Sequence, residues 1–494
     1  MLHADLIRPL ATALHDHAQA RGDELAFADD ERRCSWGELE DRTRRLGGAL
    51  ADRVAPGDVV AISMGNRVEA VEAYLAVTRA AAVGAFLNPA AAESELRYML
   101  DDCGADVLVT DPDGRERLGR GVTVEELAAD DGGTSARDDL DLDAPAWMLY
   151  TSGTTGRPKG VLLTQRSCLY VVAACWAPAL GLRAGDCLLS PLPLFHSYAL
   201  NVSVVAIVAT GASERVLPRF STDRVLELLR TRPITLLAGV PTMFHYLADA
   251  LGEDGRLDAQ ALRACVSAGA ILPAELTERF EARAAVPLLD GYGITETSTM
   301  VTMNWPDGAR PAGSCGLPLP GCAVRLVDPG TGADVEPGEE GELLVRGPQV
   351  MLGYHNRPQD TAEALRDGWY HSGDLARADP HGFLTITGRI KELIIRGGEN
   401  IDPAEVEQAV AQHPDVEDAA VVGRPDEALG EVVAAFVVPR GEDVDADAVK
   451  AFVGEHLAGF KVPAEVHAID AIPRTGSGKV QRHKLAKRLA ESEA

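Results

Sequence analysis

The sequence predicts an α/β protein with a large N-terminal region, a β-rich subdomain and a small C-terminal α+β domain. Residues 1–145 alternate between amphipathic helices and short apolar runs, which is typical of a parallel sheet covered by helices. From residue 313 to 390 the pattern changes to short strands separated by Pro/Gly turns. After residue 389 a new series of helices and strands begins, long enough at roughly 100 residues for a domain of its own.

We therefore expect an N-terminal domain of residues 1–389, which includes the β-rich subdomain at about 313–389, and a C-terminal domain of residues 390–494. In the first of these, Ser35 followed by Glu38 indicates a capped helix start. The expected strands are residues 59–63, 85–87, 107–109, 146–149, 161–163, 187–190, 234–240, 262–267, 323–327, 341–346, 416–422 and 432–438. The other expected helices are residues 68–82, 222–229, 243–250, 403–410 and 446–457.

Composition narrows the class of protein. The 494 residues are 46% hydrophobic and 25% charged, as in ordinary soluble proteins. A net charge of −28 argues against general binding of nucleic acid or anionic membranes. The eight cysteines form no C-x-x-C pair, which favours reduced, buried thiols and a cytoplasmic location. The uncharged stretch 197–213 is short and interrupted by polar residues, so we expect a core segment rather than a membrane span.

One loop has the composition of a phosphate site. It joins two apolar runs and is rich in glycine and hydroxyl side chains, with a lysine at its exit. Backbone N–H groups, hydroxyls and a positive charge are what a polyphosphate requires, although a solvated Gly/Thr turn is the alternative. The number of donors favours phosphate binding, and the spacing is not that of the P-loop. The candidate ligands are Thr151, Ser152, Gly153, Thr154, Thr155, Gly156 and Lys159.

This loop resembles the signature of the adenylate-forming enzymes, the superfamily of acyl-CoA and aryl-CoA synthetases, peptide-synthetase adenylation domains and firefly luciferase. Three further motifs follow in the family's order over nearly the whole chain. They are Asp290-Gly291-Tyr292-Gly293-Ile294-Thr295-Glu296-Thr297, Tyr370-His371-Ser372-Gly373-Asp374 and Pro473-Arg474-Thr475-Gly476-Ser477-Gly478-Lys479. Each alone could be a turn or a flexible basic tail; together they are specific.

The resemblance implies that ATP, Mg²⁺ and coenzyme A are the cofactors. Tyr292 would stack on adenine, with Asp290 near its edge, and Gly291 and Gly293 would leave the ring free to lie against a flat ligand. Thr295 would bind the α-phosphate and Glu296 would hold Mg²⁺.

The remaining roles follow from the same resemblance. Asp374 and Arg389 would bind the ribose hydroxyls. Lys479 would be the catalytic residue of the first half-reaction, bridging the acid carboxylate and the α-phosphate. Lys391 matches the hinge about which a mobile C-terminal domain rotates between the two half-reactions.

The expected reaction is activation of a carboxylic acid to acyl-AMP, followed by transfer to coenzyme A. The segment after Phe195 lacks the aspartate that grips an amino acid, and the expected pocket segments contain no Lys or Arg, which disfavours a dicarboxylate. A fatty or aryl acid without an α-amine remains. The expected substrate-binding residues are His196, Val240, Ala268, Gly269, Ala270 and Met300, although a lone histidine after an apolar run is usually just packed.

Two alternatives remain open. One is an acyl-AMP ligase that passes the acyl group to a carrier protein or another nucleophile. The other is a non-catalytic relative that only binds nucleotide or acyl ligands; the intact Lys159, Glu296, Asp374, Arg389 and Lys479 speak against it.

Overall fold

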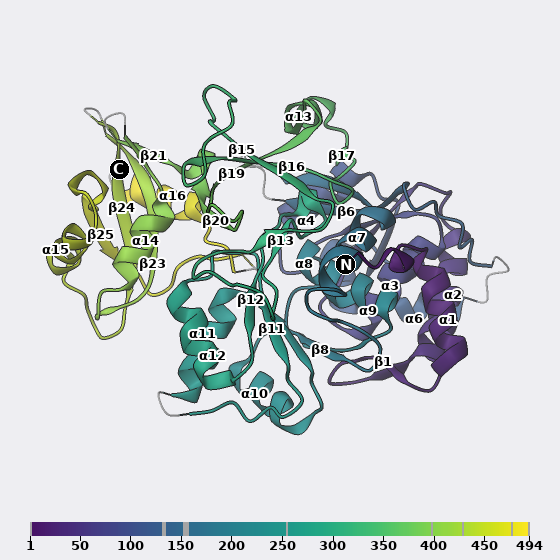
Figure 1. The fold of residues 1–494 in the computed structure, drawn as a ribbon. Helices are drawn as coiled ribbons and strands as arrows, with labels where there is room; N and C mark the ends of the chain where they lie inside the picture. The colour runs from purple at the N-terminus through teal and green to yellow at the C-terminus, as the bar shows by residue number, and fades with distance from the viewer. Residues whose placement is uncertain are drawn as a thin grey trace. The chain divides into compact units, whose positions relative to one another are not determined.

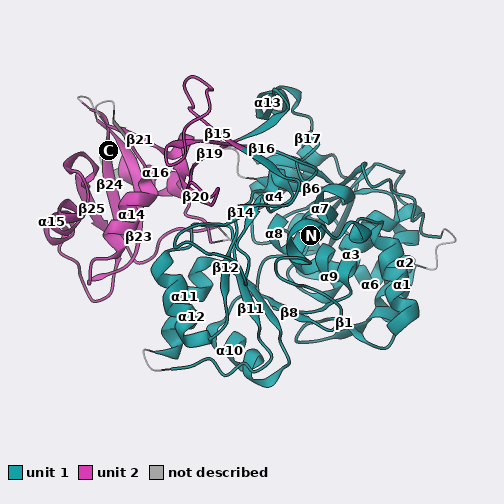
Figure 2. Ribbon diagram, viewed as in Figure 1, with its two compact units in different colours: residues 1–324, 345–371 teal, residues 325–344, 372–494 magenta. Residues whose placement is uncertain are grey.

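The computed structural model describes residues 2–130, 135–151, 158–252, 255–396, 399–426, 429–475 and 478–492. The chain divides into two compact units (Figures 1 and 2): unit 1 comprises residues 1–324 and 345–371, and unit 2 comprises residues 325–344 and 372–494. In the described part of the chain, no helix is both long enough and apolar enough to cross a bilayer. All eight cysteines are unbonded thiols, and seven of them are buried.

A seven-stranded sheet forms one half of unit 1. Its strands are parallel, except that edge strand β2 runs antiparallel to β1. The residues of β10 and β11 are buried on both faces, as expected for parallel strands covered by helices. In spatial order the strands are β12 (Leu288–Asp290), β11 (Ala264–Ser267), β10 (Leu236–Gly239), β8 (Cys187–Ser190), β9 (Ser213–Val216), β1 (Leu25–Ala28) and β2 (Arg33–Ser35).

Three helices pack on one face of this sheet (Figure 1): α10 (Thr222–Thr231), α11 (Pro241–Leu251) and α12 (Ala274–Ala284). Their apolar residues join those of the strands in one core cluster. Phe244 of α11 and Phe280 of α12 meet edge to face, with ring centroids 5.1 Å apart. This packing fixes the carboxyl ends of the strands, where sequence analysis places several site residues.

A six-stranded sheet forms the other half of unit 1. Strands β3, β4, β5 and β6 are parallel, and β7 returns antiparallel to β6. Helices α4 (Glu93–Cys103) and α5 (Pro112–Leu118) contribute to its core cluster. In spatial order the strands are β17 (Gly353–Tyr354), β7 (Lys159–Thr164), β6 (Pro145–Thr151), β4 (Val83–Phe86), β3 (Val59–Ser63) and β5 (Val107–Thr110).

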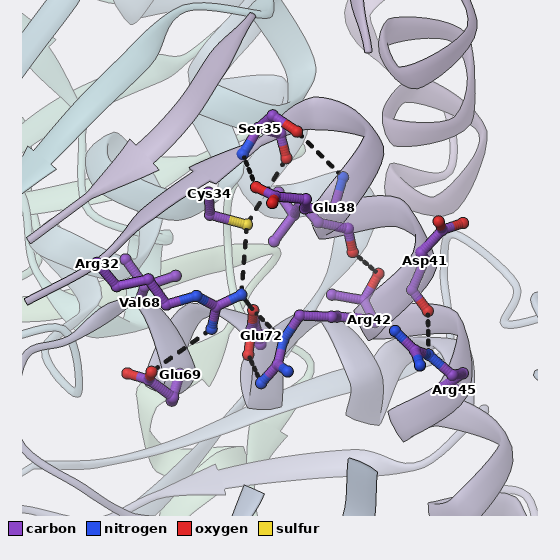
Figure 3. Close-up of polar contacts among 12 residues, drawn as sticks. Arg32, Cys34, Ser35, Glu38, Asp41, Arg42, Arg45, Val68, Glu69 and Glu72 are labelled. Carbon is purple, nitrogen blue, oxygen red and sulfur yellow. Dashed lines mark hydrogen bonds and ion pairs between the residues drawn. The ribbon is translucent and has the colours of Figure 1, made fainter. Parts of the chain in front are cut away.

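Helices α2 (Trp36–Ala51) and α3 (Val68–Arg79) are joined by a buried ionic network, shown in Figure 3. The carboxylate of Glu72 on α3 is fully buried and accepts two hydrogen bonds from Arg42 on α2, at 2.7 and 2.8 Å. Arg32 lies 2.9 Å from the same carboxylate. The capping box that the sequence predicts at Ser35 and Glu38 is present.

The uncharged stretch 197–213 forms a buried helical segment of unit 1. It consists of α8 (Ser197–Ala199), the π-helix η3 (Leu200–Val205) and α9 (Ala206–Thr210). A second α-to-π run precedes it in the chain, as α7 (Gln165–Val171) and η2 (Val172–Trp176). The remaining helices of unit 1 are η1 (Ala4–Leu6), α1 (Leu10–Arg21), α6 (Val124–Ala129), η4 (Thr295–Thr297) and α13 (Pro358–Ala364).

Short strands begin at residue 302, earlier than the predicted β-rich region of 313–390. A two-stranded sheet pairs β13 (Thr302–Met303) with β14 (Leu317–Pro318). A five-stranded sheet follows, and the division into units cuts its strands β15, β16 and β19. Its members are β15 (Ala323–Val327), β16 (Glu340–Arg346), β19 (Trp369–Ala378), β18 (Leu365–Arg366) and β20 (Leu384–Arg389).

The last 100 residues of unit 2 form a sheet covered on both faces. Helices α14 (Pro403–Ala411) and α15 (Ala446–His456) pack on one face, and α16 (Arg482–Ser492) packs on the other. Short 3₁₀ turns η5 (Ile390–Glu392) and η6 (Gly459–Lys461) complete the helical elements. The strands are β22 (Glu399–Ile401), β21 (Ile394–Arg396), β24 (Gly430–Pro439), β23 (Val416–Asp426) and β25 (Glu465–Ala468).

Candidate active site

The hydroxyl-rich loop connects the antiparallel strands β6 and β7. Thr151 lies directly opposite Lys159 in the register, and Tyr150 lies opposite Gly160, so the two ends of the loop are held side by side. A Cβ on Gly160 would come within 2.8 Å of the Met148 sulfur, which explains a glycine there. The candidate ligands Ser152, Gly153, Thr154, Thr155 and Gly156 lie outside the described residues.

Lys159 has an ionic partner in unit 1. Its Nζ atom lies 3.0 Å from Oδ1 of Asp360, in the first turn of α13, and 5.2 Å from the centre of the Tyr354 ring. Tyr354 is near because β17 pairs antiparallel with β7. Sequence analysis predicted neither Asp360 nor Tyr354 as site residues, because the pairing that brings them to Lys159 is non-local.

Glu296 lies in the 3₁₀ turn η4 and accepts a hydrogen bond from the Tyr354 hydroxyl at 3.0 Å. Burial and, second, the charge of Glu296 raise the pKa of Tyr354, so its phenol stays protonated and can donate. The same two causes raise the pKa of the neighbouring Tyr370. In the ranges that the structure describes, no three His, Cys, Asp or Glu side chains form a metal-binding group. A single carboxylate is compatible with a bound Mg²⁺, because this ion commonly takes its other ligands from phosphate and water.

Thr295 precedes Glu296 and connects two elements of the site. Its hydroxyl lies 3.2 Å from that of Ser197, the first residue of α8. His196 is the N-cap residue of α8 and is half-buried. The contact brings the start of α8 beside Thr295, where the resemblance implies that the α-phosphate binds.

Asp290 and Tyr292 lie at and beyond the carboxyl end of β12. Asp290 is 9% exposed, and burial raises the pKa of its carboxyl well above the ordinary value. Tyr292 is half-buried and is held through its backbone: its carbonyl accepts from Val301 N at 2.8 Å, and its N–H donates to the Thr302 hydroxyl at 3.3 Å.

The structure gives the glycines beside Tyr292 a different reason from the predicted one. A Cβ on Gly293 would overlap the carbonyl of Thr299, and a Cβ on Gly291 would overlap the side chain of Met300. These two glycines therefore allow close packing of the loop against residues 299–303, whether or not a flat ligand is present.

The predicted acyl-pocket residues differ in burial. Val240, Ala268 and Met300 are buried, whereas Ala270 is exposed. Gly269 has φ +90°, a backbone conformation that strongly favours glycine.

Two polar residues of the expected pocket segments, Tyr198 in 196–201 and Ser267 in 267–271, have their hydroxyls at the carboxyl end of β11. The Tyr198 hydroxyl donates to the carbonyl of Val266 at 3.2 Å. The hydroxyl of Ser267 is buried and has no hydrogen-bond partner in the described part of the chain. The Tyr198 ring stacks on Trp176, at 6.1 Å between centroids. Tyr198 lies only two residues after His196, but no local pattern shows that its side chain points toward the strand.

In unit 2 the structure pairs the two predicted ribose ligands with each other. Asp374 on β19 lies opposite Arg389 on β20, and Arg389 Nε donates to Asp374 Oδ1 at 2.7 Å. The Asp374 side chain is 4% exposed and that of Arg389 is 45% exposed. Gly373, which has φ +68°, turns the chain just before Asp374.

Lys479 forms two local hydrogen bonds with Thr475. Its N–H donates to the Thr475 hydroxyl at 3.1 Å, and its carbonyl accepts from Thr475 N at 2.7 Å. Arg474, which precedes Thr475, donates twice to Asp418, at 2.8 and 2.9 Å. The predicted hinge residue Lys391 lies in η5 within unit 2, and its side chain is outside the described part.

Comparison with known proteins shows the family to which this chain belongs. Residues 14–355 match the AMP-binding enzyme family, and residues 405–479 match the AMP-binding enzyme C-terminal domain. A feruloyl-CoA synthase from an Amycolatopsis species is 38% identical over 468 residues, which cover 92% of this chain and 94% of that protein. The chain therefore belongs to the AMP-binding enzyme family. It is an AMP-forming acid–thiol ligase of the acyl-CoA synthetase type, with ATP, Mg²⁺ and coenzyme A as cofactors.

Two solved structures are similar over nearly the whole chain. ATP-bound MatB from Rhodopseudomonas palustris has a TM-score of 0.90 and 33% identity, covering 98% of this chain and 99% of that one. The o-succinylbenzoate CoA synthetase MenE from Bacillus subtilis, in complex with its acyl-adenylate intermediate, has a TM-score of 0.87 and 31% identity, covering 97% and 98%. Both bear out the predicted fold, a large N-terminal α/β domain with a small C-terminal domain.

Proposed function

We propose that the enzyme converts an aromatic carboxylic acid, without an α-amine or a second acidic group, into its coenzyme A thioester. The observation that carries this proposal is the arrangement of α8. Ser197 contacts Thr295 at the expected phosphate position, and the next residue, Tyr198, stacks on Trp176 and reaches Val266. The stacked rings of Tyr198 and Trp176 thus begin one residue after the contact with the expected adenylate site. Planar acids pack well on such rings.

A feruloyl-CoA synthase among the similar proteins supports an aromatic acid with one carboxyl group, whereas the acid named for the o-succinylbenzoate CoA synthetase is aromatic but has two. The buried Val240, Ala268 and Met300 would complete an apolar slot, with the hydroxyls of Ser267 and Tyr198 as its polar groups. A fatty acid could use the apolar residues, but it would leave the Ser267 hydroxyl without a partner.

In the first half-reaction, a carboxylate oxygen attacks the α-phosphorus, the bond to the β-phosphate breaks and pyrophosphate leaves. We assign Lys159 and the loop before it to the outer phosphates, Thr295 to the α-phosphate and Lys479 to the charge that grows between carboxylate and α-phosphate. Glu296 would hold Mg²⁺, which neutralises phosphate charge when bound. Tyr292 and Asp290 would bind adenine, and Asp374 and Arg389 the ribose.

In the second half-reaction, the thiolate of coenzyme A attacks the acyl carbon and AMP leaves with the bonding electron pair. The Asp374–Arg389 pair can hold the nucleotide through both steps, since a carboxylate and a guanidinium bind ribose hydroxyls without taking part in the chemistry. A carrier-protein thiol is the alternative acceptor.

The experiment that tests this proposal measures pyrophosphate release over hydroxycinnamic, benzoic, fatty and amino acids, each with and without coenzyme A, with products identified by mass. We expect the highest kcat/KM with an aromatic acid, and a coenzyme A thioester as product. Preference for a fatty or amino acid would overturn the substrate assignment. Adenylate formation with no thioester would overturn coenzyme A as the acceptor.

A further inference from the structure

Asp360 is placed at Lys159 by a rigid connection between strand and helix. The N–H of Tyr354, on β17, donates to the Thr361 hydroxyl at 2.9 Å, which attaches the start of α13 to the strand. A Cβ on Gly353 would come within 2.7 Å of the Thr361 methyl, so strand and helix are in close contact. The backbone of Asp360 is therefore held near Lys159 by the junction of β17 and α13.

The ion pair is shielded from solvent. The side chains of Lys159 and Asp360 are 15% and 29% exposed, and the face of the Tyr354 ring lies beside the ammonium group. The hydroxyl of Tyr354 is bonded to Glu296. The two carboxylates therefore have different partners. Glu296, the expected magnesium ligand, is bonded to Tyr354, whereas Asp360 is paired with Lys159.

This pairing has a consequence for phosphate binding. The ammonium group expected to contact the outer phosphates of ATP is already held by a carboxylate at 3.0 Å. An incoming triphosphate must compete with that carboxylate and must also approach a like charge, which is unfavourable in a partly buried site. The same competition helps Lys159 to release pyrophosphate.

We propose that Asp360 is a positioning residue that holds Lys159 in the nucleotide-free enzyme and competes with the β- and γ-phosphates for it. This inference rests on the proposed role of Lys159 in ATP binding. Asp360 thereby weakens the binding of ATP and pyrophosphate, but it does not affect AMP, which lacks the outer phosphates.

The test compares the binding of MgATP, magnesium pyrophosphate and AMP by calorimetry, without acid, to wild type and Asp360→Asn. We expect Asp360→Asn to bind MgATP and pyrophosphate about three- to tenfold more tightly, while the Kd for AMP stays within about twofold. Asp360→Glu, which restores the charge, should return both affinities toward those of wild type. Glu363→Gln is the matched control, because it removes the same charge from an exposed position of α13 and should change nothing.

A double-mutant cycle shows whether the effect acts through the lysine. In a Lys159→Ala background, Asp360→Asn should tighten MgATP binding clearly less, because only the direct repulsion between Asp360 and the phosphates remains to be relieved. Three results would each overturn the inference. Folded Asp360→Asn could bind MgATP no more tightly than wild type, or it could bind AMP more tightly by the same factor. Alternatively, Asp360→Asn could tighten MgATP binding by the same factor when Lys159 is absent. If wild type bound no MgATP at all, the proposed nucleotide site would fail as well; if only the variant failed to respond, the role of Asp360 alone would be lost.

Discussion

Two residues next to Glu296 have backbone conformations that are unusual for their side chains. Ser298 has φ +51° and Thr299 has φ +102°, and both are buried with hydroxyls that find no hydrogen-bond partner among the described residues. A positive φ at a β-branched residue is strained, and such strain is commonly found at functional sites. Gly293 accommodates this turn, since only a residue without Cβ fits against the Thr299 carbonyl.

A buried carboxyl elsewhere in unit 1 gives a pH-dependent prediction. Glu214 on β9 is fully buried, and neither of its carboxylate oxygens has a hydrogen-bond partner in the described part of the chain. Burial raises the pKa of Glu214 well above the ordinary value of 4.5. Above pH 4.5 the unfolded chain gains from ionisation while the folded chain does not, so this residue lowers the free energy of unfolding as pH rises.

Glu214→Gln removes that ionisation. We expect the free energy of unfolding of the variant, relative to wild type, to increase between pH 5 and pH 8 in denaturant titrations. Glu116→Gln, at an exposed position of α5, should show no such trend. A difference between Glu214→Gln and wild type that stays constant over this pH range would contradict the account.

At the scale of elements, the network in Figure 3 joins α2 and α3 through a buried charge. Glu72→Gln would leave Arg42 and Arg32 without their shared carboxylate, and breaking such a buried pair costs about 3 kcal/mol or more of unfolding free energy. Tryptophan fluorescence during denaturation suits the measurement, because all five tryptophans lie in unit 1.

The matched control for this network is Glu69→Gln. Glu69 is 21% exposed and has one ion-pair contact, of 3.5 Å with Arg32, so we expect a loss below about 1 kcal/mol. Equal losses for the two variants would mean that the burial of Glu72 does not determine the stability of this helix pair.

Elements with strong local patterns could be predicted from the sequence. The strand at 59–63 and the two paired strands that flank the hydroxyl-rich loop, next to Thr151 and Lys159, were predicted correctly. An apolar run between turn residues is a local signal. The helix predicted at 68–82 ends at Arg79, since Ala81 adopts φ +54°. Arg137 lies outside every predicted element, yet its guanidinium donates to the carbonyl of Ala51 at 2.7 Å.

Contacts between distant elements could not be predicted in this way. In the sequence, Asp360 is only an acidic residue in the first turn of a helix. Its partner Lys159 lies 201 positions earlier in the chain and meets it only through the pairing of β17 with β7. Likewise, the antiparallel register of β19 and β20 is what places Asp374 opposite Arg389. The motifs themselves indicated the residues, but only tertiary structure shows their partners.

At the scale of the whole molecule, the proposed site residues come from both units. Lys159, Thr295 and Glu296 belong to unit 1, whereas Asp374, Arg389 and Lys479 belong to unit 2. Lys479 is assigned to the first half-reaction alone. Lys479→Ala should therefore lower acid-dependent pyrophosphate release by about 100- to 1000-fold.

In the same variant, thioester formation from preformed acyl-AMP and coenzyme A should stay within about threefold of wild type, measured as AMP release in single turnovers. Equal loss in both half-reactions would refute this role for Lys479. Nearly full pyrophosphate release would mean that another residue stabilises the charge that grows between carboxylate and α-phosphate.

The central claim is that the acid's own carboxylate becomes bonded to the α-phosphorus of ATP before the thiol attacks. The most direct measurement uses the preferred acid labelled with ¹⁸O in its carboxylate, together with ATP and coenzyme A, and determines the mass of the nucleotide product. Our account predicts AMP that carries one ¹⁸O atom, because the oxygen bridging acyl carbon and phosphorus leaves with AMP. Unlabelled AMP, or ADP as the product, would contradict it.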